Sequence, residues 1–447
     1  METPDTPDAV DFSLPRSREA NERLNALIPG GAHTYAKGDD QYPEDLAPVI
    51  SHGRGAHVWD VDGNRYVEYG SGLRSVSLGH AHPRVTEAVR RELDRGGNFV
   101  RPSLLEAEAA ERFLATVPTA EMVKFAKNGS DATTAAVRLA RAATGRPRVA
   151  ICADHPFFSV DDWFIGTTPM SAGVPAATGD LTVTFPYGDL AATEELLTRY
   201  EGEVACLVLE PATHTEPPPG YLAGLRALAD RHGCVLVFDE MITGFRWSEA
   251  GAQGLYGVVP DLSTFGKALG NGFAVSALAG RRGLMERGGL RHSGDRVFLL
   301  STTHGAETHS LAAAMAVQTV YTEEGVTARL HTLGERLASG VRDAAAGMGV
   351  GDHVVVRGRA SNLVFATLDE RRRPSQEYRT LFLRRLLAGG VLAPSFVVSA
   401  ALTDADIDRT VDVVAQACAV YRKALDAGDP TPWTGGRPVK PVFRRRA

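Results

Sequence analysis

Cysteine is scarce in this chain of 447 residues, which contains only four: Cys152, Cys206, Cys234 and Cys418. Each lies in an apolar stretch, and no two have the Cys-x-x-Cys spacing of redox or zinc motifs. We therefore expect buried free thiols rather than a disulfide framework. Such thiols are typical of a reducing compartment, so we expect a cytoplasmic protein.

Long apolar runs and an excess of basic residues are also missing. The longest uncharged apolar stretch, residues 389–402, contains two glycines and a proline and is too short to span a bilayer. The first residues are acidic and punctuated by proline, unlike a signal peptide. Lys and Arg number 48 against 54 Asp and Glu, a net charge of −6. We therefore expect neither a membrane nor a nucleic acid as a partner.

Motifs of several common enzyme classes are absent. A Walker A loop fails around Lys267, because Asp261 stands where the loop needs glycine and Ala268 where it needs Ser or Thr. Neither Gly-x-Ser-x-Gly nor His-Glu-x-x-His occurs. His80 and His82 have no third ligand at metal-binding spacing, so we interpret them as part of a turn and expect no metal.

The residues that are present predict an α/β protein. Hydrophobic residues make up 44% and charged residues 23% of the chain, which is typical of a soluble protein with two or three domains. After residue 80, short apolar strands alternate with amphipathic helices, a pattern that indicates a mainly parallel sheet covered on both faces. We expect strands near 123–125, 149–152, 204–209 and 235–238, and helices such as 132–143 and 221–232.

Both ends of the chain have a different pattern. Residues 1–16 are expected to be disordered, and a helix is expected over 18–28. Asp62-Gly63-Asn64 lies between two short apolar runs, which is a hairpin signal. The tail after Pro430 is rich in Pro, Gly and Arg, and we interpret it as a solvated end.

The last third of the chain predicts a smaller α+β domain. We expect a helix over 328–345, strands near 354–356 and 363–366, and helices near 377–387 and 404–425. The chain is therefore divided into an N-terminal arm with a segment of the small domain (1–70), a large domain (71–325) and a C-terminal small domain (326–447).

Three short segments carry residues of distinctive chemistry. Gly129 and Ser130 open an expected helix, where free N–H groups favour a phosphate, although Ser130 as a simple N-cap is the alternative. Asp239 ends an expected strand, where α/β sheets bind ligands, although a helix cap or a loop carboxylate is the alternative. Lys267 lies among glycines and apolar residues, where desolvation lowers a lysine pKa and frees the amine for a Schiff base. An exposed turn lysine is the alternative.

Together these segments point to one cofactor. A phosphate cradle, a strand-end aspartate and a desolvated lysine are the three parts that a pyridoxal phosphate site needs. The lysine binds the aldehyde, the aspartate pairs with the pyridine nitrogen so that the ring acts as an electron sink, and the cradle holds the phosphate. We therefore predict pyridoxal 5′-phosphate (PLP) as the cofactor.

The sequence resembles the class III aminotransferases of fold type I, in the branch that includes glutamate-1-semialdehyde aminomutase. The resemblance covers nearly the whole chain, and its most specific segments are 78–83, 209–211, 238–246 and 260–267. It implies a large PLP-binding domain with a mainly parallel sheet and a small α+β domain. It also implies that Lys267 is the Schiff-base lysine and Asp239 the partner of the pyridine nitrogen. The further cofactor-binding residues that it implies are Gly129, Ser130, Phe157, Glu210 and Met241.

Some implied roles rest on single positions. Phe157 would stack on the cofactor ring, with simple core packing as the alternative, and Met241 would pack on the other face. The family also places a threonine from the neighbouring subunit on the phosphate. The Asn-Pro of that family segment is missing here, so Thr303 is our choice, with Thr302 close behind. The resemblance therefore implies a homodimer with shared active sites.

Segments that would line the substrate side depart from the aminomutase pattern. Residues 396–400 lack its glutamate, and 31–41 and 211–216 differ as well. We therefore expect a transfer from an amino donor, glutamate or glutamine, to an aldehyde or ketone acceptor. The chain is similar in this to class III aminotransferases that act on sugar aldehydes in aminoglycoside and related antibiotic pathways. Arg74 or Arg246 would bind a donor carboxylate.

Polar and acidic side chains in these segments would favour a hydroxylated acceptor, with ordinary surface chemistry as the alternative: His33, Asp39, Asp40, Glu216 and Glu307. A PLP-dependent isomerase, either an aminomutase or an epimerase on an amino sugar, stays open as a second reading because it needs no external donor. A cofactor-binding protein without turnover is a third reading, and the presence of both Lys267 and Asp239 argues against it.

Overall fold

The computed structural model describes residues 12–155 and 157–445, which form two compact units. The terminal unit comprises the described residues up to 71, residues 78–81 and residues 328–444. The central unit comprises residues 72–77 and 82–327, together with Arg445. The expected division into 1–70, 71–325 and 326–447 stays a prediction. It assigns cofactor binding to one part of the chain, whereas the two compact units describe only which residues pack together.

A seven-stranded sheet forms the core of the central unit. In spatial order its strands are β4 (Met122–Ala126), β10 (Ser276–Gly280), β9 (Leu262–Phe265), β8 (Val235–Asp239), β7 (Val204–Leu209), β5 (Arg148–Cys152) and β6 (Thr182–Phe185). Strand β10 runs antiparallel to both neighbours, and the other six strands share one direction. All residues of β7, β8, β9 and β10 are buried, which requires cover on both faces. The expected mainly parallel α/β sheet is confirmed.

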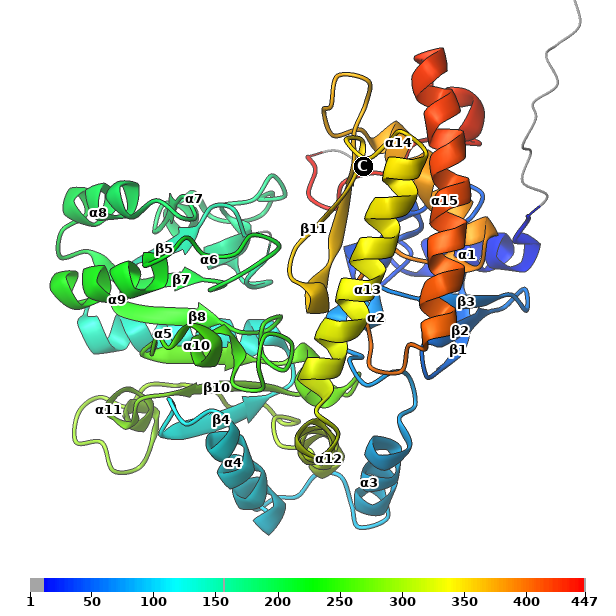
Figure 1. Cartoon of the computed structure of the whole chain (residues 1–447). Coiled ribbons are helices and arrows are strands. Elements are labelled where there is room, and N and C mark those ends of the chain that lie inside the picture. The colour runs from blue at the N-terminus through cyan, green and yellow to red at the C-terminus, as the bar shows by residue number, and fades with distance from the viewer. Residues whose placement is uncertain (1–11, 156, 446–447) are drawn as a thin grey trace, which may run out of the picture. The chain divides into compact units, whose positions relative to one another are not determined.

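Helices pack on this sheet, and their ends follow local sequence signals (Figure 1). Asn128 and Asp131 form a capping box at the start of α5, and Gly145 in a left-handed conformation ends that helix. The helices of the unit are α3 (Pro83–Leu93), α4 (Leu104–Thr116), α5 (Gly129–Thr144), α6 (Asp162–Ile165), α7 (Ala176–Gly179), α8 (Leu190–Arg199), α9 (Tyr221–His232), α10 (Gly251–Tyr256), α11 (Arg282–Met285) and α12 (Thr308–Glu324).

The terminal unit combines small sheets with long helices. Its four-stranded sheet has the order β1 (Ile50–Arg54), β2 (His57–Asp60), β3 (Arg65–Glu68) and β13 (Val391–Leu392), and β11 (Val354–Arg357) pairs with β12 (Val364–Thr367). Strands β2 and β3 form the expected hairpin. Helices α13 (Val326–Gly347) and α15 (Asp404–Ala427) lie side by side, with α1 (Pro15–Leu27) and α14 (Gln376–Ala388) in the same unit (Figure 1).

Two expectations about the chain ends are corrected. Residues 1–11 lie outside the described residues, but Leu14 is buried and Pro15 already begins α1, so residues 12–16 are ordered. The tail after Pro430 is docked rather than solvated. Val439 is 3% exposed, its N–H donates to Thr380 Oγ1 at 2.9 Å, and Arg444 pairs with Asp40.

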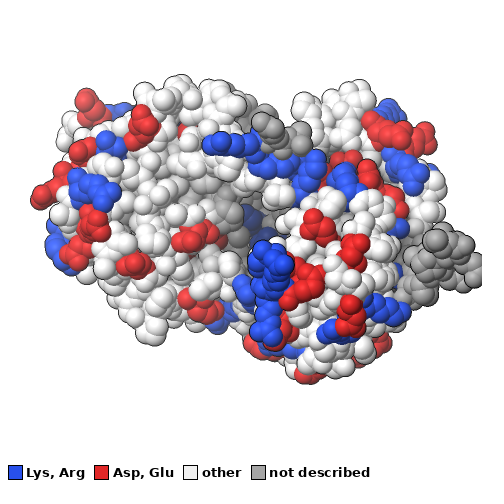
Figure 2. Space-filling model, turned by 90° about the horizontal axis from the view of Figure 1, so that it is seen from above, with Lys and Arg blue, Asp and Glu red and all other residues white. Residues whose placement is uncertain are grey.

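Charged side chains of both signs lie beside one another on the face drawn in Figure 2. All four cysteines are buried and free, as expected. Among the described residues no helix combines the length and the apolar character that crossing a bilayer demands.

The docked tail can be tested by removing its buried anchor. Val439→Ala deletes two buried methyl groups, so we expect a loss of about 2 kcal/mol in unfolding free energy. Val259, which is 42% exposed, provides the matched control, and Val259→Ala should change stability by less than about 0.5 kcal/mol. Urea unfolding measures both. Equal small effects would contradict a docked tail.

Candidate active site

The polar residues of the site stand where parallel strands end. Asp239 is the last residue of β8, Glu210 follows β7, and Lys267 follows β9 by two positions. Gly129 and Ser130 follow β4, which runs parallel to β9 because both pair antiparallel with β10. Carboxyl ends of parallel strands meet at one edge of a sheet. The topology therefore gathers these residues from segments far apart in the sequence.

Asp239 is held by two hydrogen bonds on one oxygen. The Met241 N–H donates to Oδ1 at 3.0 Å, and the Thr264 hydroxyl donates to the same oxygen at 3.1 Å. Within the described residues Oδ2 has no hydrogen-bond partner. Burial raises the Asp239 pKa to about 6, while the Met241 bond, the Lys267 charge and the Thr264 bond oppose that rise. The carboxylate is thus fixed on one side and available on the other.

The neighbouring Glu240 has a structural role. Its carboxylate accepts from the Ala252 N–H at 2.7 Å and the Gln253 N–H at 2.8 Å, and from the Thr243 hydroxyl. Glu240 therefore caps the start of α10. From the sequence, a helix cap was the alternative role for the neighbouring Asp239. Asp239 caps no helix, so the cap alternative is wrong for Asp239.

Lys267 and Glu210 complete a buried group of charges around Asp239. Burial lowers the Lys267 pKa, although Asp239 and Glu210 oppose that shift. Within the described residues Lys267 Nζ has no hydrogen-bond or ion-pair partner. Burial also raises the Glu210 pKa to about 8, and the Asp239 charge adds to the rise. The amine of Lys267 is therefore easier to deprotonate than an ordinary lysine amine.

The end of β7 is fixed by an imidazole that sequence reasoning missed. The backbone N–H of Glu210 donates to His155 Nδ1 at 3.0 Å. Burial lowers the His155 pKa to about 4, so the ring is neutral near pH 7 and Nδ1 stays an acceptor. No sequence motif marks His155, because its partner lies 55 residues away.

The start of α5 has the form expected of a phosphate cradle. Asn128, not Ser130, is the N-cap, so the N-cap alternative for Ser130 is wrong. Ser130 Oγ instead accepts from the Val160 N–H at 3.0 Å. Within the described residues the N–H groups of Gly129 and Ser130 have no acceptor. Two backbone donors at a helix N-terminus are a suitable partner for an anion.

Met241 joins the cradle to the lysine segment. It is 6% exposed, and its sulfur lies between Gly129 and Gly266. A methyl group added at Gly129 would lie 3.2 Å from Met241 Sδ, and one at Gly266 would lie 2.7 Å from it. Met241 would therefore have to shift to admit a methyl group at either position, and by more at Gly266 than at Gly129.

Phe157 lies on a segment that α5 holds in place. Its ring is 43% exposed, so the core-packing alternative is wrong, whereas the adjacent Phe158 is 2% exposed. The Thr133 hydroxyl donates to the Phe158 carbonyl at 2.8 Å, and Trp163 Nε1 donates to Thr134 Oγ1 at 2.8 Å. The preceding Pro156 lies outside the described residues.

Arg74 and Arg246 also lie near the charged group. Arg246 is fully buried, and its Nη2 donates to the Arg74 carbonyl at 3.1 Å. Gly72, Leu73 and Arg74 all have positive φ, at 56°, 59° and 72°. This conformation costs roughly 1–2 kcal/mol per non-glycine residue. This left-handed turn could not be predicted from the sequence, because Gly72 is the one residue of the three that favours positive φ.

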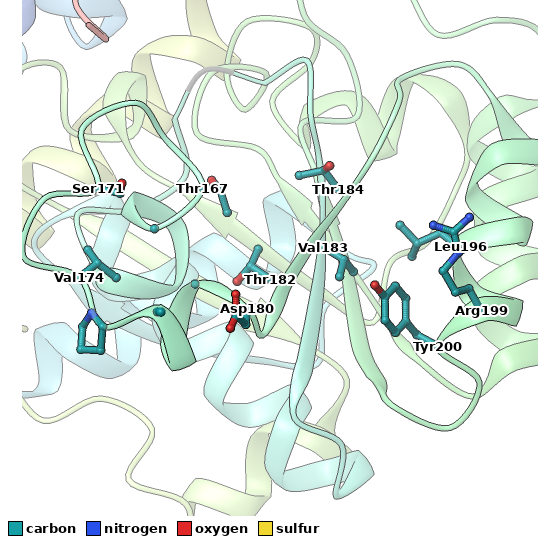
Figure 3. Close-up of a pocket in the computed structure, with 14 residues that line it drawn as sticks. Thr167, Ser171, Val174, Asp180, Thr182, Val183, Thr184, Leu196, Arg199 and Tyr200 are labelled. Carbon is teal, nitrogen blue, oxygen red and sulfur yellow. The ribbon is translucent and has the colours of Figure 1, made fainter. Parts of the chain in front are cut away.

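Thr303 is exposed on the segment before α12, and its carbonyl accepts from Asn98 Nδ2 at 3.0 Å. Among the described residues no hydrogen bond or ion pair joins Thr303 to the residues at the sheet edge. A cavity of about 690 Å³ opens elsewhere, beside the edge strand β6, and its lining includes none of the predicted site residues (Figure 3). No cluster of three or more metal-ligating side chains occurs in residues 12–155 and 157–445.

Comparisons with known proteins now decide the family. The profile of the family described as "Aminotransferase class-III" matches residues 39–417. The chain belongs to the class III aminotransferases. A glutamate-1-semialdehyde 2,1-aminomutase of Desulfitobacterium hafniense is 34% identical over 426 residues, which cover 90% of this chain and 98% of that protein.

Solved structures agree with this family. An omega-transaminase of Sphaerobacter thermophilus has a TM-score of 0.79 at 27% identity, covering 90% of this chain and 97% of that one. A transaminase solved with PLP bound has a TM-score of 0.84 at 25% identity, covering 93% and 99%. The expected fold-type I architecture, enzyme class and PLP cofactor are confirmed.

The contact between Gly266 and Met241 predicts a steric effect. Gly266 has φ of 178°, which any residue adopts, so Gly266→Ala should destabilise only through Met241, by about 1–3 kcal/mol. Urea unfolding should show this loss and its partial relief in the Met241→Ala background. Gly283→Ala, whose added methyl meets nothing within 4 Å, is the matched control. A loss that persists unchanged without Met241 would contradict the contact.

The raised pKa of Asp239 predicts a pH-dependent stability of the apoenzyme. The pKa in the folded state is about 6 against an ordinary 3.8, so charging Asp239 destabilises the folded state as pH rises between these values. Asp239→Asn should therefore stabilise the apoenzyme at pH 8 by about 1–3 kcal/mol and by less at pH 5. Denaturant unfolding at both pH values measures the difference. Exposed Asp412→Asn is the control, and a pH-independent loss at Asp239 would refute the account.

Proposed function

We propose that this enzyme transfers an amino group from glutamate or glutamine to an aldehyde or ketone acceptor, an oxidised sugar or aminoglycoside intermediate. The observation that supports transfer chemistry is the buried trio of Lys267, Asp239 and Glu210 beside the free N–H groups of the cradle. We further propose a cytoplasmic location, which the four buried thiols suit.

The residues present fit PLP. The free N–H groups of Gly129 and Ser130 would hold its phosphate, and Asp239 Oδ2, which has no partner among the described residues, would face the ring nitrogen. Lys267 would hold the aldehyde carbon through its amine. Met241 and Phe157 would contact the two ring faces, and Glu210 would lie beside the ring.

In this proposal Lys267 transfers the proton and Asp239 keeps the cofactor ring protonated. Bound PLP supplies an electron sink for the electrons left when the donor carbon loses its proton. The lowered pKa of Lys267 lets its amine take that proton as a general base and return it as a general acid. Asp239, ionised above about pH 6, keeps a proton on the ring nitrogen. Arg246 or Arg74 would bind the donor carboxylate.

The sugar acceptor rests on departures from the aminomutase pattern. Phe396, Val397 and Val398 are fully buried in the segment where that pattern carries glutamate. Of the polar groups that would favour a hydroxylated acceptor, Asp40 and Glu307 are engaged in ion pairs with Arg444 and Lys127. The acceptor proposal therefore depends on the missing glutamate more than on these carboxylates.

A second candidate function is isomerisation. The aminomutase of Desulfitobacterium hafniense is 34% identical to this chain over nearly its full length. An aminomutase moves nitrogen within one substrate and consumes no external donor, so donor consumption separates the two functions.

We also propose a homodimer with shared active sites. From the end of α3 to the start of α4, four apolar side chains are exposed, at 54%, 51%, 100% and 83%: Leu93, Phe99, Val100 and Leu104. Exposed apolar side chains so close together in the sequence would suit an interaction site, and we propose that a second copy covers them. Asn98, in the same segment, donates to the Thr303 carbonyl, so in such a dimer Thr303 would reach the partner's site.

Turnover assays test the proposed function. We expect L-glutamate to be converted to 2-oxoglutarate beyond a single turnover only when a hydroxylated aldehyde is present. Lys267→Ala should reduce this rate at least about 10²–10⁴-fold by removing the general base. Exposed Lys124→Ala on β4 is the matched control and should keep the wild-type rate.

Glutamate-1-semialdehyde provides the opposing assay. Its isomerisation without any donor, at a rate that Lys267→Ala abolishes, would replace the transfer proposal with the isomerase. Full activity of Lys267→Ala in both assays would refute the site itself.

A further inference from the structure

One ion pair links the cradle loop to α12. The ammonium of Lys127 lies 2.5 Å from Glu307 Oε2, and it donates to Ser310 Oγ at 2.8 Å and to the Ala274 carbonyl at 3.2 Å. Both partners are largely buried, with 14% and 21% of their side chains exposed. Lys127 therefore joins three segments: the cradle loop, the loop that follows Lys267, and the first turn of α12.

Glu307 is the centre of a small charged cluster. His304 Nδ1 lies 2.9 Å from Oε1, and His309 Nε2 lies 3.6 Å from Oε2. Burial acts to raise the Glu307 pKa, but the Lys127 bond and the neighbouring charges of Lys127, His309 and His304 together hold it below its usual range. The carboxylate is therefore ionised at neutral pH, and the pair with Lys127 is charge-assisted.

Lys127 directly precedes Asn128, the N-cap residue with which the cradle begins. The Asp131 carboxylate accepts from the Asn128 N–H at 2.9 Å, and the Ser276 hydroxyl donates to the Asn128 carbonyl at 2.7 Å. The backbone is thus held from within α5 and from β10. The side chain of Lys127 adds the tie to α12, at the residue before the N-cap.

We propose that Lys127 and Glu307 are positioning residues that clasp α12 to the cradle and so set its affinity for the phosphate of PLP. The inference rests on the proposed function, because it takes the free N–H groups of Gly129 and Ser130 as the phosphate site. A displaced Asn128 would misdirect both N–H groups, whereas the lysine and aspartate of the site would stay in place.

The test compares the apoenzyme's dissociation constants for PLP and for pyridoxal, which lacks the phosphate. Lys127→Met should raise the constant for PLP roughly tenfold, equivalent to about 1.4 kcal/mol, and change that for pyridoxal less than about twofold. Glu307→Gln, which keeps the other two bonds of Lys127, should raise the PLP constant by about threefold. Exposed Lys124→Met should leave both constants unchanged.

The double variant Lys127→Met/Glu307→Gln distinguishes a role in positioning the cradle from a repulsion between an unpaired Glu307 and the phosphate. If the clasp positions the cradle, the double variant stays as weak for PLP as Lys127→Met. Recovery of wild-type affinity would show that an unpaired Glu307 merely repels phosphate, and it would overturn the proposal. So would equal weakening for PLP and pyridoxal, or none.

Failure of the proposed function and failure of the clasp would give different binding results. A wild-type apoenzyme that binds neither PLP nor pyridoxal would refute the cofactor site, whereas a wild-type enzyme that binds PLP no better than Lys127→Met refutes only the clasp. If Lys127→Met does not fold, Glu307→Gln and the PLP-to-pyridoxal ratio decide the question.

Discussion

Burial of three ionisable side chains at one edge of the sheet is the constraint on which the site depends. Parallel strands bring Asp239, Glu210 and Lys267 together, and desolvation then shifts each pKa toward its neutral form. The Asp239 carboxyl, with a pKa of about 6, is ionised at neutral pH, and the Lys267 amine loses its proton more easily than an ordinary lysine amine. An amine of this kind suits the proton transfer that we propose for Lys267. The left-handed turn at residues 72–74 adds strain beside this group, as is frequent at functional sites.

Around that group, polar contacts hold the loops that the sheet alone would leave free. Glu240 caps α10, the hydroxyls of α5 hold the segment after Phe157, and Lys127 ties the cradle to α12. Buried hydrogen bonds of this kind fix one arrangement, because each unmade bond would cost about 1–3 kcal/mol. The positions of the site residues therefore follow from loops as much as from strands.

The sequence predicted the parts of the fold that have a local signal. Strand β8 and helix α9 were expected because their apolar periodicity is strong, whereas β9 and β10 were missed because they are short and rich in Ser, Thr, Ala and Gly. Asp239 was predicted from its place at the end of an expected strand, and Lys267 from its glycine-rich and apolar surroundings. His155 and the Lys127–Glu307 pair were not, because their partners lie 55 and 180 residues away in the chain. Ion pairs across such separations leave no pattern in a single sequence.

The absorption spectrum of the purified enzyme, before and after addition of L-glutamate, shows whether the enzyme takes up an amino group from this donor. We expect a visible band from PLP bound through Lys267, and we expect it to bleach when the amino group is taken up. A band indifferent to every amino donor would contradict amino transfer. A colourless protein that stays colourless with added PLP would contradict the cofactor site itself.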